Sequence, residues 1–358
     1  MEQVKGKTDF DLFSHAHAQQ AFDDEQRIVA TGEPLIGIEE KETWEDGRIT
    51  WVSSTKMPLK NNKGEIIGTF GISRDITEHK EAELRASRYA DEIHRIKEDM
   101  EEDVRMAGEL QKTFFPSFYP SFPENATLEQ SAVEFLHRYQ SSGMVSGDFC
   151  TIRRLSETRS GIFLCDVMGH GVRAALGTAL ICAIVEEISG IAQDPGDFLM
   201  RMNELLLPIL QQEDTFLYAT ACYMDFDVAT GVLRVANAGH PDPLLFHEKG
   251  TSEWVIGDDS KRGPALAICP NASYPLVKRT LVPGDSVVMY TDGIYEIVNI
   301  DDEEFGEERL REASGRSCGK SLPDLFQSLI SEAENFAGGD KFNDDVCLVG
   351  LRYRKPLS

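Results

Sequence analysis

The chain has 358 residues, enough for about two domains and a connector. Its 61 acidic and 36 basic residues give a formal charge of −25 at pH 7, so neither nucleic acid nor anionic lipid is expected as a partner. No apolar run is long enough to cross a bilayer, and the N-terminus lacks the apolar region of a secretory signal, so the expected location is cytoplasmic.

The cysteines and histidines do not form metal-binding patterns. No two of the seven cysteines have Cys-x-x-Cys spacing, which argues against structural zinc and indicates reduced core residues. The eight histidines show neither His-x-x-x-His nor His-Glu-x-x-His spacing. Any metal ion is therefore expected to have oxygen ligands.

The first part of the chain has the pattern of one helix followed by three strands. Ser14 is a candidate N-cap, apolar residues then recur at helical spacing, and Gly32 is expected to end the helix. Asp46-Gly47 and residues 61–64 are typical of hairpin turns. They separate three strand-like runs, 35–44, 48–59 and 65–76, so the sequence predicts a helix and an antiparallel meander.

Residues 77–114 are dominated by Glu, Lys, Arg and Ala and carry apolar side chains in a heptad pattern. The a positions are Ala86, Ile93, Met100, Ala107 and Phe114, and the d positions are Ala82, Tyr89, Ile96, Asp103 and Leu110. Asp103 is the one polar exception. The pattern favours a coiled-coil-like signalling helix and a homodimer through helix 82–114. A surface helix packed on its own domain is the alternative.

Three prolines, Pro116, Pro120 and Pro123, end this helix, and strands alternate with helices in the rest of the chain. Helices are expected over 172–189, 195–210 and 321–336. Strands are expected at 133–139, 149–155, 162–165, 217–226, 232–236, 244–247, 254–256, 276–281, 286–290 and 346–351. This succession predicts an α+β fold in which two antiparallel sheets pack together and helices cover them.

Four aspartates lie at ends of the predicted apolar strands: Asp148, Asp166, Asp292 and Asp344. A single aspartate of this kind is usually part of a turn or a helix cap. Four that bound the same set of strands indicate instead a cluster of carboxylates on a rim. Two carboxylates about 5 Å apart repel each other by roughly 3 kcal/mol at an effective dielectric near 20, so such a cluster requires cations.

Two divalent cations in a carboxylate cluster would activate water and orient the oxygens of an in-line displacement. This is the chemistry of phosphoester hydrolysis without a protein nucleophile. The sequence contains no Cys-x5-Arg loop, no Gly-x-Ser-x-Gly elbow and no Gly-x4-Gly-Lys-Ser/Thr phosphate loop, which agrees with that interpretation.

Residues from about 110 to 353 resemble the SpoIIE/RsbU-like branch of the metal-dependent type 2C (PPM) serine/threonine protein phosphatases. Six segments carry the resemblance in the family's order: Gly108-Glu-Leu-Gln-Lys-Thr-Phe-Phe-Pro116, Ser146-Gly-Asp-Phe149, Asp166-Val-Met-Gly-His-Gly171, Asn237-Ala-Gly-His-Pro241, Thr291-Asp-Gly-Ile-Tyr-Glu296 and Asn343-Asp-Asp-Val346. The resemblance implies an αββα sandwich with two Mn²⁺ or Mg²⁺ ions at one edge.

The same resemblance implies the roles of individual residues. Asp166 would bridge both ions, with the Val167 carbonyl as a further ligand. Asp148 would bind one ion, and Asp292 and Asp344 the other. Asp166 and Asp292 would thereby be catalytic, through a metal-activated water that attacks phosphoserine or phosphothreonine. The implied substrate is a small anti-anti-sigma-like protein in bacterial sigma-factor regulation.

The chain departs from the family pattern at four positions, none of them a proposed ligand: Ser146, Met168, Asp242 and Cys347. These departures concern the fit of the substrate. His170 is a candidate general acid, and a loop-stabilising role is its alternative. Asn237 and His240 are expected to orient a turn between strands.

The N-terminal unit resembles the later part of a PAS sensor domain, in residues 51–58, 64–68 and 71–78. Because only five residues precede Gly6, we expect a partial PAS domain, which would act as a ligand sensor or as a dimerising scaffold. The expected division is a partial PAS domain at 1–78, a signalling helix at 79–115 and the phosphatase domain at 116–356.

Three other functions are weighed against a PAS-regulated phosphatase. The loop Ser146-Gly-Asp-Phe149 resembles that of a nucleotide cyclase, but Phe149 replaces its essential acidic residue. His94 lies in a helix like that of a PAS histidine kinase, but no nucleotide-binding glycine boxes follow. A catalytically silent docking module would most simply lack a ligand aspartate, and all four are present.

Overall fold

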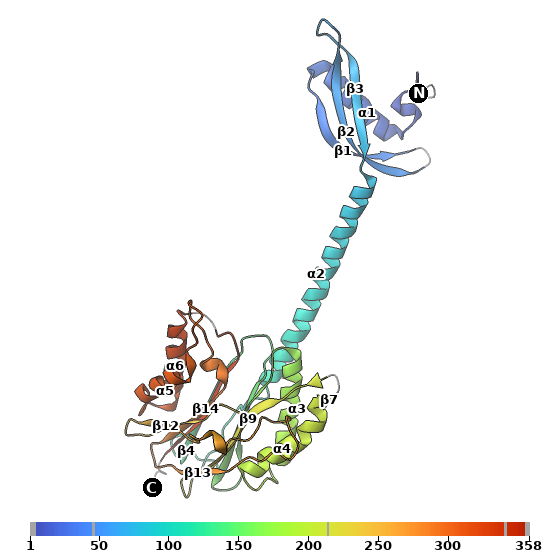
Figure 1. Ribbon diagram of the computed structural model, residues 1–358. Coiled ribbons are helices and arrows are strands. Elements are labelled where there is room, and N and C mark those ends of the chain that lie inside the picture. The colour runs from blue at the N-terminus through green and yellow to red at the C-terminus, as the bar shows by residue number, and fades with distance from the viewer. Residues whose placement is uncertain (1–4, 45–46, 213–214, 340–341, 355–358) are drawn as a thin grey trace. The chain divides into compact units, whose positions relative to one another are not determined.

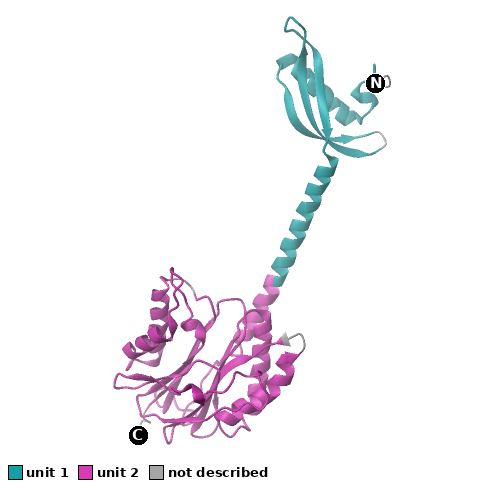
Figure 2. Ribbon diagram, viewed as in Figure 1, with its two compact units in different colours: residues 1–100 teal, residues 101–358 magenta. Residues whose placement is uncertain are grey.

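The structure, a computed structural model, describes residues 5–44, 47–212, 215–339 and 342–354. The chain forms two compact units, Met1–Met100 and Glu101–Ser358 (Figure 2). Helix α2 (Thr77–Lys112) contains the boundary between them. The predicted domain boundaries at 78, 115 and 356 stay predictions, and residues 1–4 and 355–358 lie outside the described part.

The first unit contains the predicted helix and meander. Its elements are the short 3-10 helix η1 (Asp9–Asp11), α1 (His15–Thr31), β1 (Leu35–Thr43), β2 (Ile49–Lys60) and β3 (Ile66–Asp75), and the three strands form an antiparallel sheet in chain order. Gly32 ends α1 in the left-handed region, at φ 75°. Ser14 precedes the helix as predicted, although its side chain makes no capping hydrogen bond. The Asp46-Gly47 turn lies partly outside the described residues.

Helix α2 is buried only near its C-terminal end. Its buried residues are Gly108 and Gln111, both in the second unit. The heptad side chains nearer its N-terminus are exposed in the single chain, for example Ile93 at 66% and Met100 at 63%. The alternative of a helix packed along its own domain is therefore not supported, and pairing with a second chain stays a prediction.

The second unit is built on two five-stranded antiparallel sheets (Figure 1). The first has the order β13-β10-β9-β6-β5 and the second β12-β11-β14-β15-β4. Their strands are β4 (Val133–Gln140), β5 (Asp148–Arg154), β6 (Arg159–Val167), β9 (Ala219–Asp227), β10 (Val232–Ala238), β11 (Leu244–Phe246), β12 (Ser252–Trp254), β13 (Val277–Thr280), β14 (Ser286–Tyr290) and β15 (Val346–Tyr353). These correspond to the ten strands predicted for this region.

The two faces of the first sheet pack into different cores, because successive side chains along a strand point to opposite faces. On β6, Ile162 and Leu164 belong to the core between the sheets, with Val287 and Val349 of the second sheet. Their neighbour Phe163 packs instead with the helices α3 (Val172–Ile188) and α4 (Pro195–Leu210). The outer face of the second sheet packs against α5 (Gly306–Arg316) and α6 (Leu322–Phe336). The layers are thus helix, sheet, sheet and helix, which confirms the predicted fold class.

Some elements of the second unit were not predicted. They are the short strands β7 (Gln211–Gln212) and β8 (Thr215–Phe216), the 3-10 helices η2 (Asp259–Lys261) and η3 (Asp292–Ile294), and the helix α5, whose sequence is mostly charged. None of the described helices combines the length and the apolar character needed to span a bilayer.

Candidate metal centre

Asp148 and Asp166 lie opposite each other on neighbouring strands. Asp148 begins β5, Asp166 is near the end of β6, and the two residues are direct partners in the antiparallel register. Partners of this kind project to the same face of a sheet. Asp148 is almost fully buried and Asp166 is partly exposed. The register therefore places two predicted ligands side by side at one end of the first sheet.

Gly147 makes room for the oxygens of this pair. A Cβ atom at this position would lie 2.6 Å from the carbonyl oxygen of Val167 and 2.9 Å from Oδ1 of Asp166. Both oxygens therefore face the same small space above the Gly147 backbone. The predicted ligands Asp166 and Val167 thus present oxygen atoms to one region, and only glycine permits this approach.

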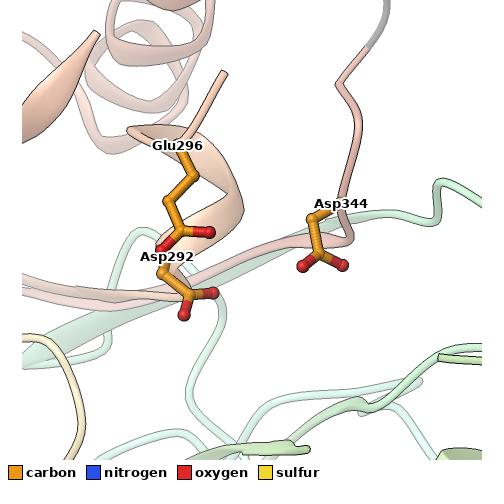
Figure 3. Close-up of side chains that lie close together, drawn as sticks. All are labelled: Asp292, Glu296 and Asp344. Carbon is orange, nitrogen blue, oxygen red and sulfur yellow. The ribbon is translucent and has the colours of Figure 1, made fainter. Parts of the chain in front are cut away.

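The second group of carboxylates comes from the other sheet. Asp292 begins the 3-10 helix η3 (Asp292–Ile294) directly after β14, and Asp344 lies two residues before β15. Asp292, Glu296 and Asp344 each offer an oxygen, and these atoms lie within 4.8 Å of one another (Figure 3). Gly293 allows the close approach of the two segments, because a Cβ there would lie 2.1 Å from the carbonyl oxygen of Asp345.

The pKa shifts indicate that the carboxylates of the two sheets repel one another and so form one electrostatic cluster. Burial, followed by repulsion from Asp292, Asp344 and other carboxylates, raises the pKa of Asp166 to about 7. Burial and the charge of Asp166 raise the pKa of Asp148 well above its usual range. The pKa values of Asp292 and Glu296 are raised for the same two reasons.

The donor set fits divalent cations. Among the described residues, no lysine or arginine forms an ion pair with any of the five carboxylates, Asp148, Asp166, Asp292, Glu296 and Asp344. Without a cation, burial and the like charges of their neighbours make Asp148, Asp166, Asp292 and Glu296 resist ionisation. An all-oxygen set of this kind is what Mg²⁺ and Mn²⁺ prefer.

Hydrogen bonds from neighbouring side chains hold the ligand loops in place. Thr291 Oγ1 donates to Oδ2 of Asp148 at 2.8 Å and accepts from the backbone N–H of Cys347 at 2.9 Å. The carboxylate of Asp345 accepts from the N–H groups of Ser142 at 2.7 Å and Gly147 at 3.2 Å. These contacts connect the loop before β5 to both segments of the second sheet.

Two helices also hold the backbone that precedes Asp148. The Gln111 amide on α2 donates to the Ser146 carbonyl at 2.7 Å and accepts from the Ser146 N–H at 2.9 Å. Thr178 Oγ1 on α3 donates to the Gly147 carbonyl at 3.0 Å. The conformation of the Asp148 loop therefore depends on both helices.

The remaining candidate residues, His170, Asn237 and His240, have different surroundings. His170 is exposed in the turn before α3, and no described residue hydrogen-bonds to its ring. The Asn237 side chain accepts from the His240 N–H and donates to the His240 carbonyl, each at 2.8 Å, as expected for residues that orient a turn.

Glu296 is the site residue that sequence reasoning missed. It lies within the motif Thr291–Glu296, but only the aspartate was assigned a role there. The available signal was its spacing of four residues from Asp292; Glu296 lies just after η3, and its backbone N–H donates to the Asp292 carbonyl at 3.0 Å. Asp345 was also missed, because its carboxylate bonds to loops that are distant in sequence.

Comparisons with known proteins match both parts of the chain to described families. The sequence profile described as "Stage II sporulation protein E (SpoIIE)" matches residues 156–354, and the one described as "PAS fold" matches residues 1–81. The chain is 23% identical over 320 residues to protein IcfG of Synechocystis sp., covering 82% of this chain and 47% of IcfG. It is 26% identical over 159 residues to the phosphoserine phosphatase RsbP of Bacillus subtilis, covering 44% of this chain and 38% of RsbP. The chain thus spans about half or less of these two relatives.

A solved structure shares the fold of the second unit. The SiaA-PP2C domain of Pseudomonas aeruginosa is 18% identical, with a TM-score of 0.60 over 72% of this chain and 98% of that domain. The αββα sandwich is therefore the fold of a PP2C domain, and the resemblance of the N-terminal unit to PAS is confirmed by the profile match.

Proposed function

The chain belongs to the SpoIIE family, and on that premise we propose that it is a metal-dependent phosphatase of phosphoserine and phosphothreonine in proteins. One observation carries the proposal: carboxylates from both sheets, among them the buried Asp148, converge without a compensating lysine or arginine among the described residues. A PP2C fold with such a cluster at the end of its sheets supports hydrolysis of a phosphoester.

We assign the ligands in two groups. Asp148, Asp166 and the carbonyl of Val167 would hold one cation, and Asp292 and Asp344 would hold a second, with Asp166 shared between them. Glu296 joins the second group because its carboxylate lies with those of Asp292 and Asp344. Two Mn²⁺ or Mg²⁺ ions supply Lewis-acid activation of water and charge stabilisation of the phosphoryl oxygens when bound.

The residues of the chain orient this chemistry. Thr291 holds the carboxylate of Asp148, and Gly147 and Gly293 let the ligand segments approach each other. His170, exposed beside the cluster, is positioned to hydrogen-bond to water and is our candidate proton donor to the leaving serine or threonine oxygen.

The proposal extends to the substrate of the chain, its assembly and its regulation. RsbP is named a phosphoserine phosphatase, which supports a phosphoprotein substrate for this chain, of the anti-anti-sigma type in sigma-factor regulation. We further propose a cytoplasmic homodimer paired through helix 82–114, with the PAS unit as the regulatory input.

The test is hydrolysis of p-nitrophenyl phosphate by the full chain with EDTA, Mg²⁺ or Mn²⁺. Turnover that requires the cation and falls at least about 100-fold in Asp292→Asn is expected. Asp302→Asn is the matched control, since Asp302 is an exposed aspartate in a nearby loop outside the cluster. A folded wild-type chain that neither binds the cation nor turns over would instead favour a catalytically silent docking module.

A further inference from the structure

A groove of about 740 Å³ opens directly beside the candidate metal centre. It is lined by Val104 near the end of helix α2, the loop 142–145, the turn 169–172 and the loop 342–344. Asp166 and Asp344 belong to the same lining. A substrate whose phosphoryl group lies at this centre would therefore have its neighbouring atoms in the groove.

Part of the groove lining is apolar. Val145 and Phe342 are buried in its floor, and Val104 contributes a partly exposed wall. Met144 and Val172, about half exposed at 52% and 51%, extend this apolar surface into solvent. Large apolar side chains that water covers in the free protein gain stability when a partner covers them instead.

The turn between Asp166 and α3 leaves its backbone accessible to the groove. Gly169 and Gly171 have φ values of 89° and 79°, and a Cβ atom on either would meet no other atom within 4 Å. The space above both residues is therefore open. An extended segment of another protein can approach this backbone closely, which is the usual basis of peptide binding through main-chain contacts.

The charge of the groove disfavours acidic ligands. Asp166 and Asp344 are the acidic residues of its lining, which also holds the basic side chain of His170, and Asp292 and Glu296 lie next to the two aspartates. Cations bound at the centre would interact with the phosphoryl group of the substrate. An aspartate or glutamate next to the phosphorylated residue would then meet several carboxylates and a single basic side chain of the lining, His170.

We propose that this groove binds the residues adjacent to the phosphorylated serine or threonine and selects apolar over acidic side chains there. This inference rests on the proposed phosphatase function and adds a substrate class to it. It also gives helix α2 a direct part in specificity, because Val104 forms one wall.

The test compares two synthetic nine-residue phosphoserine peptides, with leucine or with glutamate on both sides of the phosphoserine. The full chain with Mn²⁺ is expected to have a kcat/KM about tenfold higher for the leucine peptide. In Val104→Lys the leucine-to-glutamate ratio is expected to fall about tenfold, because an apolar wall becomes cationic. Fluorescence anisotropy measures binding of both peptides in parallel. The preference between the peptides can then be measured even if the chain does not hydrolyse them.

Met106→Lys is the matched control. Met106 is exposed on the same helix, two residues from Val104 and outside the groove lining, so it should leave the ratio unchanged. Equal kcat/KM and equal binding of the two peptides by the wild type would overturn the proposal, as would an equal change of the ratio in Met106→Lys. If Mn²⁺-dependent hydrolysis of p-nitrophenyl phosphate is absent as well, the proposed function itself is overturned.

Discussion

Two adjacent aspartates illustrate how single residues at this site differ in role. Asp344 is exposed, and its carboxylate lies with those of Asp292 and Glu296. Asp345 is buried, and its carboxylate accepts hydrogen bonds from the N–H groups of Ser142 and Gly147. In the proposed centre Asp344 would offer oxygens to a cation, while its neighbour Asp345 fixes the loop that carries Asp148.

Thr291 gives a first prediction at this scale. Thr291→Val removes the donor to Asp148 and the acceptor for the Cys347 N–H, both buried. The loss is expected to cost about 1–3 kcal/mol of unfolding free energy and to weaken Mn²⁺ binding about 10- to 100-fold. Thermal denaturation and Mn²⁺ titration check both effects. Thr291→Ser retains the hydroxyl, and equal losses in the serine and valine variants would contradict the account.

The raised pKa of Asp166 predicts how pH changes the effect of a cation. Since this pKa is about 7 in the folded chain and the ordinary value is 3.8, the metal-free folded chain holds a proton that the unfolded chain has released. The corresponding stability is lost as pH rises from about 4 through 7. A cation binds the ionised form, so Mn²⁺ should raise Tm more at pH 8 than at pH 6. Melting curves with Mn²⁺ and with EDTA measure this difference, and an equal rise at both values would contradict it.

The sequence predicted the four aspartates because each lies where an apolar strand gives way to a turn. For Glu296 the sequence offers a weak signal, its spacing of four residues from Asp292, since the turn after η3 that brings the two carboxylates together has no strong local pattern. It could not predict Asp345 or Thr291, whose partners are far away in sequence. Long-range pairing of the two sheets creates these contacts.

At the scale of elements, helix α2 is attached to the site by one side chain. Gln111 makes two hydrogen bonds to the backbone of Ser146, two residues before Asp148. Gly108 fits against the same loop, because a Cβ there would lie 2.0 Å from the Met144 carbonyl oxygen. The position of the helix end and the geometry of the Asp148 loop are therefore linked.

Gln111→Ala tests this link. Removal of the amide leaves the buried Ser146 N–H unpaired and takes the 2.7 Å bond from the Ser146 carbonyl, which keeps a contact of 3.4 Å from Thr178 Oγ1, so the Asp148 loop is held less firmly. We expect kcat/KM for p-nitrophenyl phosphate to fall about tenfold and the Mn²⁺ concentration for half-maximal activity to rise. Lys112→Ala, at an exposed neighbouring position, is the control. Full activity of Gln111→Ala at low Mn²⁺ would show that the Asp148 loop does not need the two hydrogen bonds from Gln111.

Most elements were predictable because alternation and helical spacing are local signals. The charged helix α5 was not, since its stability comes from packing Leu310 and Ala313 against the second sheet rather than from a long apolar stripe. The strands β7 and β8 are too short for a pattern. The Ser14 position was predicted correctly, but the expected capping bond is absent because cap geometry depends on the local backbone.

At the scale of the whole molecule, the exposed heptad stripe of α2 predicts self-association. Asp103 is its one polar core position, so Asp103→Leu should tighten pairing and shift basal phosphatase activity. Sedimentation equilibrium and turnover of p-nitrophenyl phosphate measure the two effects. Asp91→Leu makes the same change at an outward heptad position and should alter neither. Unchanged activity in an Asp103→Leu chain that pairs more tightly would refute the coupling.

The most direct test of the account is anomalous diffraction from crystals of the full chain grown with Mn²⁺. We predict two manganese peaks, one beside Asp148, Asp166 and the Val167 carbonyl, and one among Asp292, Glu296 and Asp344. Peaks elsewhere, or an ordered carboxylate cluster without manganese at a saturating concentration, would contradict the assignment of this cluster as the catalytic metal centre.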